Sequence, residues 1–163
     1  MRKETKVDAT PENLAALLRE EETIQFSEFT NETAWRIGSR LVEVATERDL
    51  GVTVDITRNG QQIFHCALAG TSPDNDEWIK RKNRVVNRFG HSSFYVGMRY
   101  RSQGTTFEEK SLLDPREYAA HGGAFPIIIA RVGVVGTVTV SGLAQEDDHK
   151  LVVSVLREFA VQA

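Results

Sequence analysis

Four histidines and one cysteine are the side chains of this chain best suited to hold a metal or to act as a base: His65, Cys66, His91, His121 and His149. No two histidines have the close spacing of a local metal-binding pair, such as i and i+4 on a helix. His65 and Cys66 are neighbours in a predicted strand, where adjacent side chains point to opposite faces, so His65 is a poor base for that thiol. Each histidine is a candidate axial haem ligand or a structural residue, and both interpretations stay open.

Two glycine-containing turns form the best candidate for a binding site. Gly122 and Gly123 allow the backbone to turn sharply and to approach another group closely. The Ser141-Gly142 turn precedes a predicted helix start, where free N–H groups and the helix dipole favour an anion. The alternative is that both turns only connect elements and cap helices. The predicted ligand-binding residues of these turns are His121, Gly122, Gly123, Phe125, Pro126, Ser141 and Gly142.

A second candidate feature is the basic face of a helix predicted from Asp74 to Gly90. Arg81, Arg84 and Arg88 are spaced three and four residues apart and therefore share one face. Guanidinium groups match carboxylates and phosphates, so Arg81 and its neighbour Lys82 are added to the predicted site. The alternative is an ordinary solvated face, with arginine stems packed on the core or paired with another subunit.

The sequence does not reveal a catalytic arrangement. Ser141 lacks the Gly-x-Ser-x-Gly context of a hydrolase nucleophile, and the chain has neither a P-loop nor a dinucleotide-binding glycine fingerprint. Asp147 and Asp148 lie at a predicted helix start, where the dipole alone is expected to satisfy their charge. No catalytic residue and no metal site is assigned, and whether the protein is an enzyme stays open.

Two predicted hairpins supply the strands that position these turns. Residues 52–57 alternate between apolar and polar side chains, as in a strand with one buried face. Asn59-Gly60 then favours a two-residue type I′ turn, because both residues tolerate positive φ, and residues 63–68 return as the partner strand. Residues 126–130 and 134–141 predict a second hairpin. Antiparallel pairing brings the start of its first strand next to the end of its second, so the two glycine turns are expected to meet.

Start signals and apolar stripes predict the helices. Hydroxyl or acidic caps, prolines at first helical positions and glycines after the last turn mark their ends. The expected helices begin at Pro11, near Asn31, at Ser72–Asp74, at Ser92 or Ser93, after Asp114 for a short helix that ends at Gly122-Gly123, and near Gln145. The predicted fold is α/β of the α+β type: a single domain over residues 1–163 with a central, mainly antiparallel sheet of about five strands, flanked by helices and profilin-like.

Composition excludes several classes of protein. A length of 163 residues suits one domain, and a net charge of −3 gives no basic field for nucleic acid. One cysteine permits no intrachain disulfide, which fits a reducing compartment, and no apolar run reaches the roughly 20 residues of a membrane span. We therefore expect a cytoplasmic protein with neither nucleic acid nor membrane as a partner.

Several segments resemble the haem-degrading-domain (HbpS-like, GlcG-like) family. The resemblance rests on residues 122–127, 135–143 and 145–149, and the extra Phe125 before Pro126 is similar to the branch known as uncharacterised protein family 0303. Residues 78–82 and 91–94 add to it. The resemblance implies an α/β subunit that assembles into a symmetric homo-oligomer, a dimer or higher, and it makes haem the candidate cofactor.

Three hypotheses on function follow. The first is a small-ligand-binding protein whose ligand is anionic, with haem or another tetrapyrrole as candidate, held near the Gly122–Pro126 turn. The second is an interaction or scaffold protein in which the oligomer itself is the functional object. The third is an enzyme with a haem-degrading or cofactor-accessory activity, which would require a bound redox cofactor or an acid–base pair.

Overall fold

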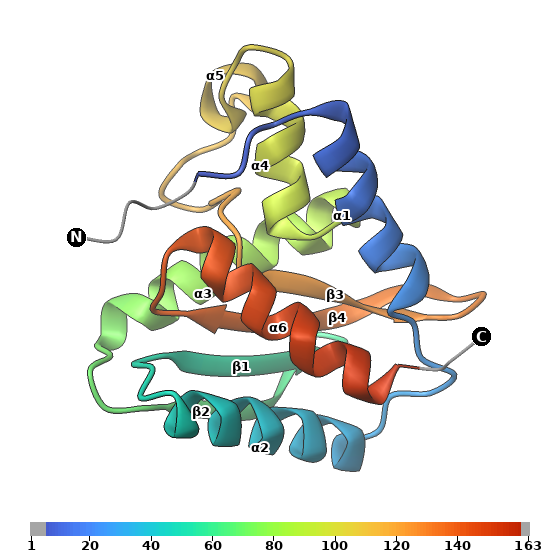
Figure 1. The fold of residues 1–163 in the computed structure, drawn as a ribbon, viewed down its shortest axis with the longest axis vertical. Coiled ribbons are helices and arrows are strands. Elements are labelled where there is room, and N and C mark those ends of the chain that lie inside the picture. Colours follow the sequence, from blue (N-terminus) through green and yellow to red (C-terminus); the bar gives the residue numbers. More distant parts are fainter. Residues whose placement is uncertain (1–5, 161–163) are drawn as a thin grey trace.

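Two hairpins build the sheet at the centre of the molecule, and Figure 1 shows the computed structural model, which describes residues 6–160. All neighbouring strands are antiparallel, in the order β2-β1-β4-β3. The strands of the described residues are β1 (Thr53–Arg58), β2 (Gln61–Ala67), β3 (Ala124–Ile129) and β4 (Gly133–Ser141). The α+β class is confirmed, but the predicted number of about five strands is wrong. The segment that comes nearest to a fifth strand makes only an isolated bridge, from Phe26 to Ile129.

The first hairpin has the predicted turn. Asn59 and Gly60 both adopt positive φ, of 51° and 79°, as the type I′ turn requires. Thr57 pairs with Gln62 and Arg58 with Gln61, so the loop has two residues.

The second hairpin joins β1 through a close backbone contact. A Cβ atom on Gly136 would collide with the carbonyl oxygen of Thr57, so glycine is needed where β4 pairs with the end of β1. The pairing of β3 with β4 also shifts register between Ile127 and Ile128, which is a bulge beside this glycine.

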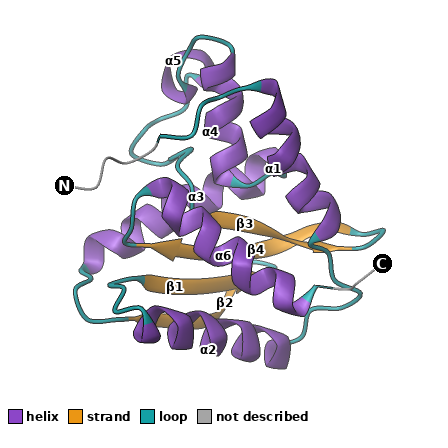
Figure 2. Cartoon of the chain, viewed as in Figure 1, coloured by secondary structure: helices purple, strands orange, loops and turns teal. Residues whose placement is uncertain are grey.

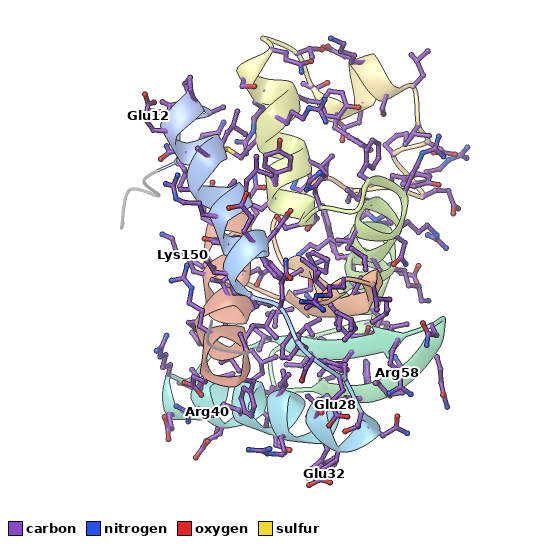
Figure 3. The ribbon with its side chains drawn as sticks, turned by 90° about the vertical axis from the view of Figure 1, so that its right-hand side faces the viewer. Glu12, Glu28, Glu32, Arg40, Arg58 and Lys150 are labelled. Carbon is purple, nitrogen blue, oxygen red and sulfur yellow. The ribbon has the colours of Figure 1, made fainter. Side chains whose placement is uncertain are left out.

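Helices cover both faces of the sheet (Figure 2). Helices α2 and α6 pack on one face and α3 on the other, while α1, α4 and α5 lie beyond the β3 edge. The helices of the described residues are α1 (Pro11–Thr23), α2 (Asn31–Glu47), α3 (Pro73–Phe89), α4 (Ser93–Ser102), α5 (Phe107–Ser111) and α6 (Gln145–Phe159). In Figure 3, labelled charged side chains such as Glu12, Glu32 and Lys150 point outward from these helices. No helix within residues 6–160 is long and apolar enough to cross a membrane.

The predicted short helix after Asp114 is wrong. Residues 115–117 form a single turn, in which the Asp114 side chain accepts hydrogen bonds from the backbone and the guanidinium of Arg116. The chain then leaves the helical path because the Ala119 N–H donates to the Arg81 carbonyl of α3, at 3.2 Å. A helix that the sequence analysis missed, α5, lies just before this segment and is capped by Thr106.

Candidate functional site

The two glycine turns lie side by side, because β3 and β4 are antiparallel. The Val140 N–H donates to the Gly123 carbonyl at 3.0 Å, which continues the β3–β4 pairing to the first turn. Gly123 has a φ of 135°, and a Cβ atom there would collide with the carbonyl oxygen of Val140. The structure therefore places the two turns next to each other, as the sequence predicts.

A buried ion pair joins α3 to α6 next to Gly123. Lys82 of α3 donates through Nζ to Asp148 Oδ2 of α6 at 3.1 Å and to the Val140 carbonyl at 3.2 Å. The two side chains are only 4% and 3% exposed. A Cβ atom on Gly123 would lie 2.6 Å from Nζ, so the absence of a side chain there makes room for the pair. The pair thus ties α3 on one face of the sheet to α6 on the other.

Burial dominates the electrostatics of this pair. Removal from water lowers the pKa of Lys82 and raises the pKa of Asp148, while their mutual attraction opposes both shifts. Asp148 also accepts a hydrogen bond from the Leu143 N–H at 2.9 Å. Because its oxygens accept from both an ammonium and a backbone donor, the geometry favours the carboxylate form.

Asp148 corrects one sequence-based expectation. The helix dipole was expected to satisfy this residue alone, but its partners are Lys82 and the backbone of the turn after Ser141. The backbone donors that were predicted to bind a ligand anion therefore already hold a carboxylate of the chain itself. Sequence spacing offered no signal for this contact, because Lys82 and Asp148 are 66 residues apart.

A hollow of about 300 Å³ opens beside this pair, between the start of α3, the end of β4 and the start of α6. Asn75 of α3 spans it at one side and donates to Ser141 Oγ at 3.2 Å. Of the predicted site residues, four line the hollow: Lys82, His121, Ser141 and Gly142. Lining residues that sequence reasoning did not assign to the site include Asn75, Trp78, Leu143, Gln145 and Asp148.

His121 is a partly exposed imidazole in the lining of the hollow. Its ring is half-buried and packs edge-on against Trp78, with 5.2 Å between ring centroids. Burial and, to a lesser degree, the charge of Lys82 lower the pKa of His121, so the imidazole is neutral at neutral pH. No hydrogen bond to this ring is found within residues 6–160. Together with Gln145, His121 also lines two adjoining hollows of about 210 and 370 Å³.

The remaining predicted site residues have other roles in the geometry. The Gly122 N–H donates to Gln145 Oε1 at 3.1 Å, which holds the turn against α6. Phe125 is completely buried in the core, and Pro126 lies in the edge strand β3, where a missing N–H is tolerated. Arg81 stacks over the Trp78 ring at 4.0 Å and so touches the hollow only through that ring.

The arginine face of α3 packs on the segment that follows α5. Arg81 donates to the Pro115 carbonyl and Arg84 to the Glu117 carbonyl, at 3.3 and 3.2 Å. Arg88 lies over the Tyr118 ring at 5.7 Å. These contacts match the interpretation in which the arginines pack on the protein rather than hold a ligand.

Three histidines pair with carboxylates elsewhere in the molecule. His65 contacts Asp76 at 2.7 Å on the surface, and the other two pairs hold α1 against the rest of the chain. Those pairs are His91 with Glu21 at 2.6 Å and His149 with Glu20 at 2.7 Å. Among the described residues, His/Cys/Asp/Glu side chains form no cluster of three that could hold a metal ion.

Comparisons with known proteins match the resemblance in the sequence. The model of the family described as haem degrading protein HbpS-like matches residues 29–157. A UPF0303 protein of Streptomyces coelicolor is 57% identical over 150 residues, which cover 92% of this chain and 95% of that protein. The crystal structure of the Ybr137w protein is 38% identical with a TM-score of 0.82, covering 90% of this chain and 87% of that one.

A more distant structure has the same fold. The crystal structure of a PduOC–haem complex aligns with a TM-score of 0.58 at 16% identity, and the alignment covers 92% of this chain and 94% of that one. At this identity the likeness concerns the fold alone. With the family match over most of its length and the identity to UPF0303 proteins, this chain belongs to the HbpS-like family, within its UPF0303 group.

Proposed function

We propose that this protein binds a small ligand in the hollow beside His121, and that haem is the first ligand to test. The observation that carries the proposal is that the His121 ring lines three adjoining hollows, and burial, which lowers its pKa, favours the neutral imidazole. Neutral histidine is the form that ligates haem iron. The family name and the haem complex of a protein with the same fold support the choice of ligand.

His121 suits haem iron as a ligand, whereas the rest of the lining is mostly polar and the volume limits the size of the ligand. The His121 ring would serve as the axial ligand, and the Trp78 ring beside it offers an apolar surface. A volume of about 300 Å³ lies at the lower end of the range for small-molecule pockets. A porphyrin would therefore have to extend over the adjoining hollows that share His121 and Gln145. When bound, the iron would supply ligand exchange and redox chemistry.

A haem titration tests this proposal. The wild-type protein is expected to give a saturable Soret band, and His121→Ala is expected to shift that band and to weaken binding about tenfold or more. His65→Ala is the matched control, because that ring is paired with Asp76 on the surface. Equal spectra and affinities for the wild type and His121→Ala would contradict the proposed ligand.

We also propose that the subunit forms a homo-oligomer. The supporting observation is an exposed aromatic surface where α2 packs on the edge strand β2: Trp35 is 66% exposed and packs against Phe64. Trp35, Arg36 and Phe159 line a shallow hollow of about 440 Å³ there, and such residues are enriched in interfaces. A light-scattering mass well above 18.2 kDa at micromolar concentration is expected, and a stable monomer would contradict the assembly.

We also propose that the protein is located in the cytoplasm. A single half-buried cysteine fits the cytoplasm, and cell fractionation with an antibody against the untagged chain is the direct measurement.

A further inference from the structure

Arg101 has a buried guanidinium nitrogen without a partner. Arg101 lies in the last turn of α4. Its Nη2 atom is buried and donates no hydrogen bond to any acceptor within residues 6–160. Buried polar groups nearly always have partners, and an unpaired buried charge is costly. A buried nitrogen without a partner needs an explanation, and an ion or ligand that binds beside it is one that can be tested.

A separate hollow of about 210 Å³ adjoins this side chain. Its lining combines two cations, Arg101 and Lys6, with one carboxylate, Glu108, so positive charge is in excess. The volume accommodates a small oxyanion with several waters, since a water molecule occupies about 30 Å³ in the liquid.

Neutral donors in the lining add to this charge. Gln145 uses its Oε1 to accept from the Gly122 N–H, and its amide nitrogen remains a possible donor in the lining. The Thr106 hydroxyl oxygen accepts from the Glu109 N–H, so its own proton is available. The lining therefore offers neutral donor groups in addition to the two cations.

We propose that this hollow binds an oxyanion group, a carboxylate or a phosphate, with Arg101 as its principal partner. The guanidinium would form charge-assisted hydrogen bonds to two oxygens of the anion. His121 and Gln145 line both this hollow and the one beside Lys82, so the inference rests in part on the proposed function and deepens it. It implies that the ligand carries an anionic group on the α4 side of His121.

A structural role for Arg101 makes a different prediction. A cation in the last helical turn interacts favourably with the helix dipole, and Arg99 of α4 shares that position while remaining exposed. Arg99→Gln therefore removes the same charge from the same turn without touching the hollow, which makes it the matched control for Arg101→Gln.

The experiment is a titration with inorganic phosphate and, separately, with succinate, followed by calorimetry and by amide chemical shifts of the full chain. The wild type and Arg99→Gln are expected to bind at least one of these anions with equal affinity. Arg101→Gln is expected to weaken that binding about tenfold or more, because a charge-assisted partner is lost. Glu108→Gln is expected to strengthen it severalfold, because a like charge is removed from the lining.

Further measurements separate the outcomes. Without anion, Arg101→Gln is expected to melt at the wild-type temperature or above it, whereas a lower melting temperature with unchanged anion binding would indicate a structural residue. Absence of binding for both anions, or equal binding by Arg101→Gln and the wild type, would overturn the inference. A failed haem titration with successful anion binding would refute haem as the ligand and leave this site standing.

Discussion

On one face of the sheet β1 and β4 present Val54, Ile56, Val138 and Val140 to α2 and α6, whereas on the other face they present polar side chains to α3. The second face buries Thr53, Asp55, Thr137, Thr139 and Ser141. The first layer is an ordinary apolar core, stabilised by removal of its surface from water. The second depends on hydrogen bonds instead.

The polar layer is only partly satisfied. Asp55 accepts from Gln62 at 2.6 Å and from Thr57 at 3.0 Å, and Thr139 donates to Asn83 of α3 at 2.5 Å. The hydroxyls of Thr53 and Thr137 are buried without a partner among the described residues. Nearby, at the end of β4, the Lys82–Asp148 pair borders the hollow beside His121. The comparison indicates that the apolar face stabilises the fold, while the polar face borders the hollow in which we propose that a ligand binds.

The largest expected effect comes from breaking the buried ion pair. Lys82→Met should lower the free energy of unfolding by about 3–5 kcal/mol at pH 7, because it leaves the Asp148 carboxylate buried without a counter-charge. The loss should be smaller at lower pH, since burial raises the pKa of Asp148 and the protonated acid needs no counter-charge.

A double-mutant cycle in denaturant measures this coupling. Lys82→Met with Asp148→Asn should recover a large part of the loss, because the amide still accepts from the Leu143 N–H. If Lys82→Met unfolds at the wild-type midpoint, the pair does not tie the two faces together.

Gly123→Ala tests the packing of the Lys82–Asp148 pair against the backbone at Gly123. It should cost about 2–4 kcal/mol, since φ is 135° and the new methyl group would press on Lys82 Nζ and the Val140 carbonyl. Gly104→Ala is the matched control: its φ is 72°, and a Cβ atom there meets nothing within 4 Å. Only the backbone strain of about 1 kcal/mol should remain in the control. Equal losses of thermal stability would mean that the packing at Gly123 contributes nothing.

Thr137 and Val138 are neighbours in β4 that lie on opposite faces of the sheet, so substituting each one tests the difference between the two faces. Val138→Thr should destabilise the protein by about 1–3 kcal/mol, because it buries a hydroxyl in the apolar layer. Thr137→Val should be neutral or stabilise by up to about 1 kcal/mol, because it removes a buried hydroxyl that has no partner among the described residues. Chemical denaturation of both variants checks the signs, and a clear loss for Thr137→Val would show that its hydroxyl is satisfied.

The smallest effect concerns His121. Its folded-state pKa is lowered by burial, so the unfolded chain binds more protons near pH 6 and stability should fall as pH drops through the ordinary histidine pKa of about 6.5. The contribution should stay below about 1 kcal/mol, because the ring is partly exposed and screened. His121→Gln should flatten this part of the pH–stability curve relative to His65→Ala. An unchanged curve would mean that the ring titrates alike in both states.

Local patterns determined much of this fold. The alternation of residues 52–57 and the Asn59-Gly60 turn predicted the first hairpin, because a two-residue turn with positive φ fixes its own register. The meeting of the two glycine turns followed from antiparallel pairing alone. The helix predicted after Asp114 is wrong. The conformation of this short segment is set by its contacts with Arg116 and with α3 rather than by its local helix propensity.

The candidate site depended far more on tertiary structure. The sequence identified His121, Lys82 and the Ser141-Gly142 turn, which are close in space for reasons of topology. It could not show that Lys82 is buried against Asp148, nor that one nitrogen of Arg101 has no partner. Periodicity assigns a residue to a face of its own helix. The partner across 66 residues, the burial and the shift in pKa arise only when α3, α4 and α6 pack around the end of the sheet.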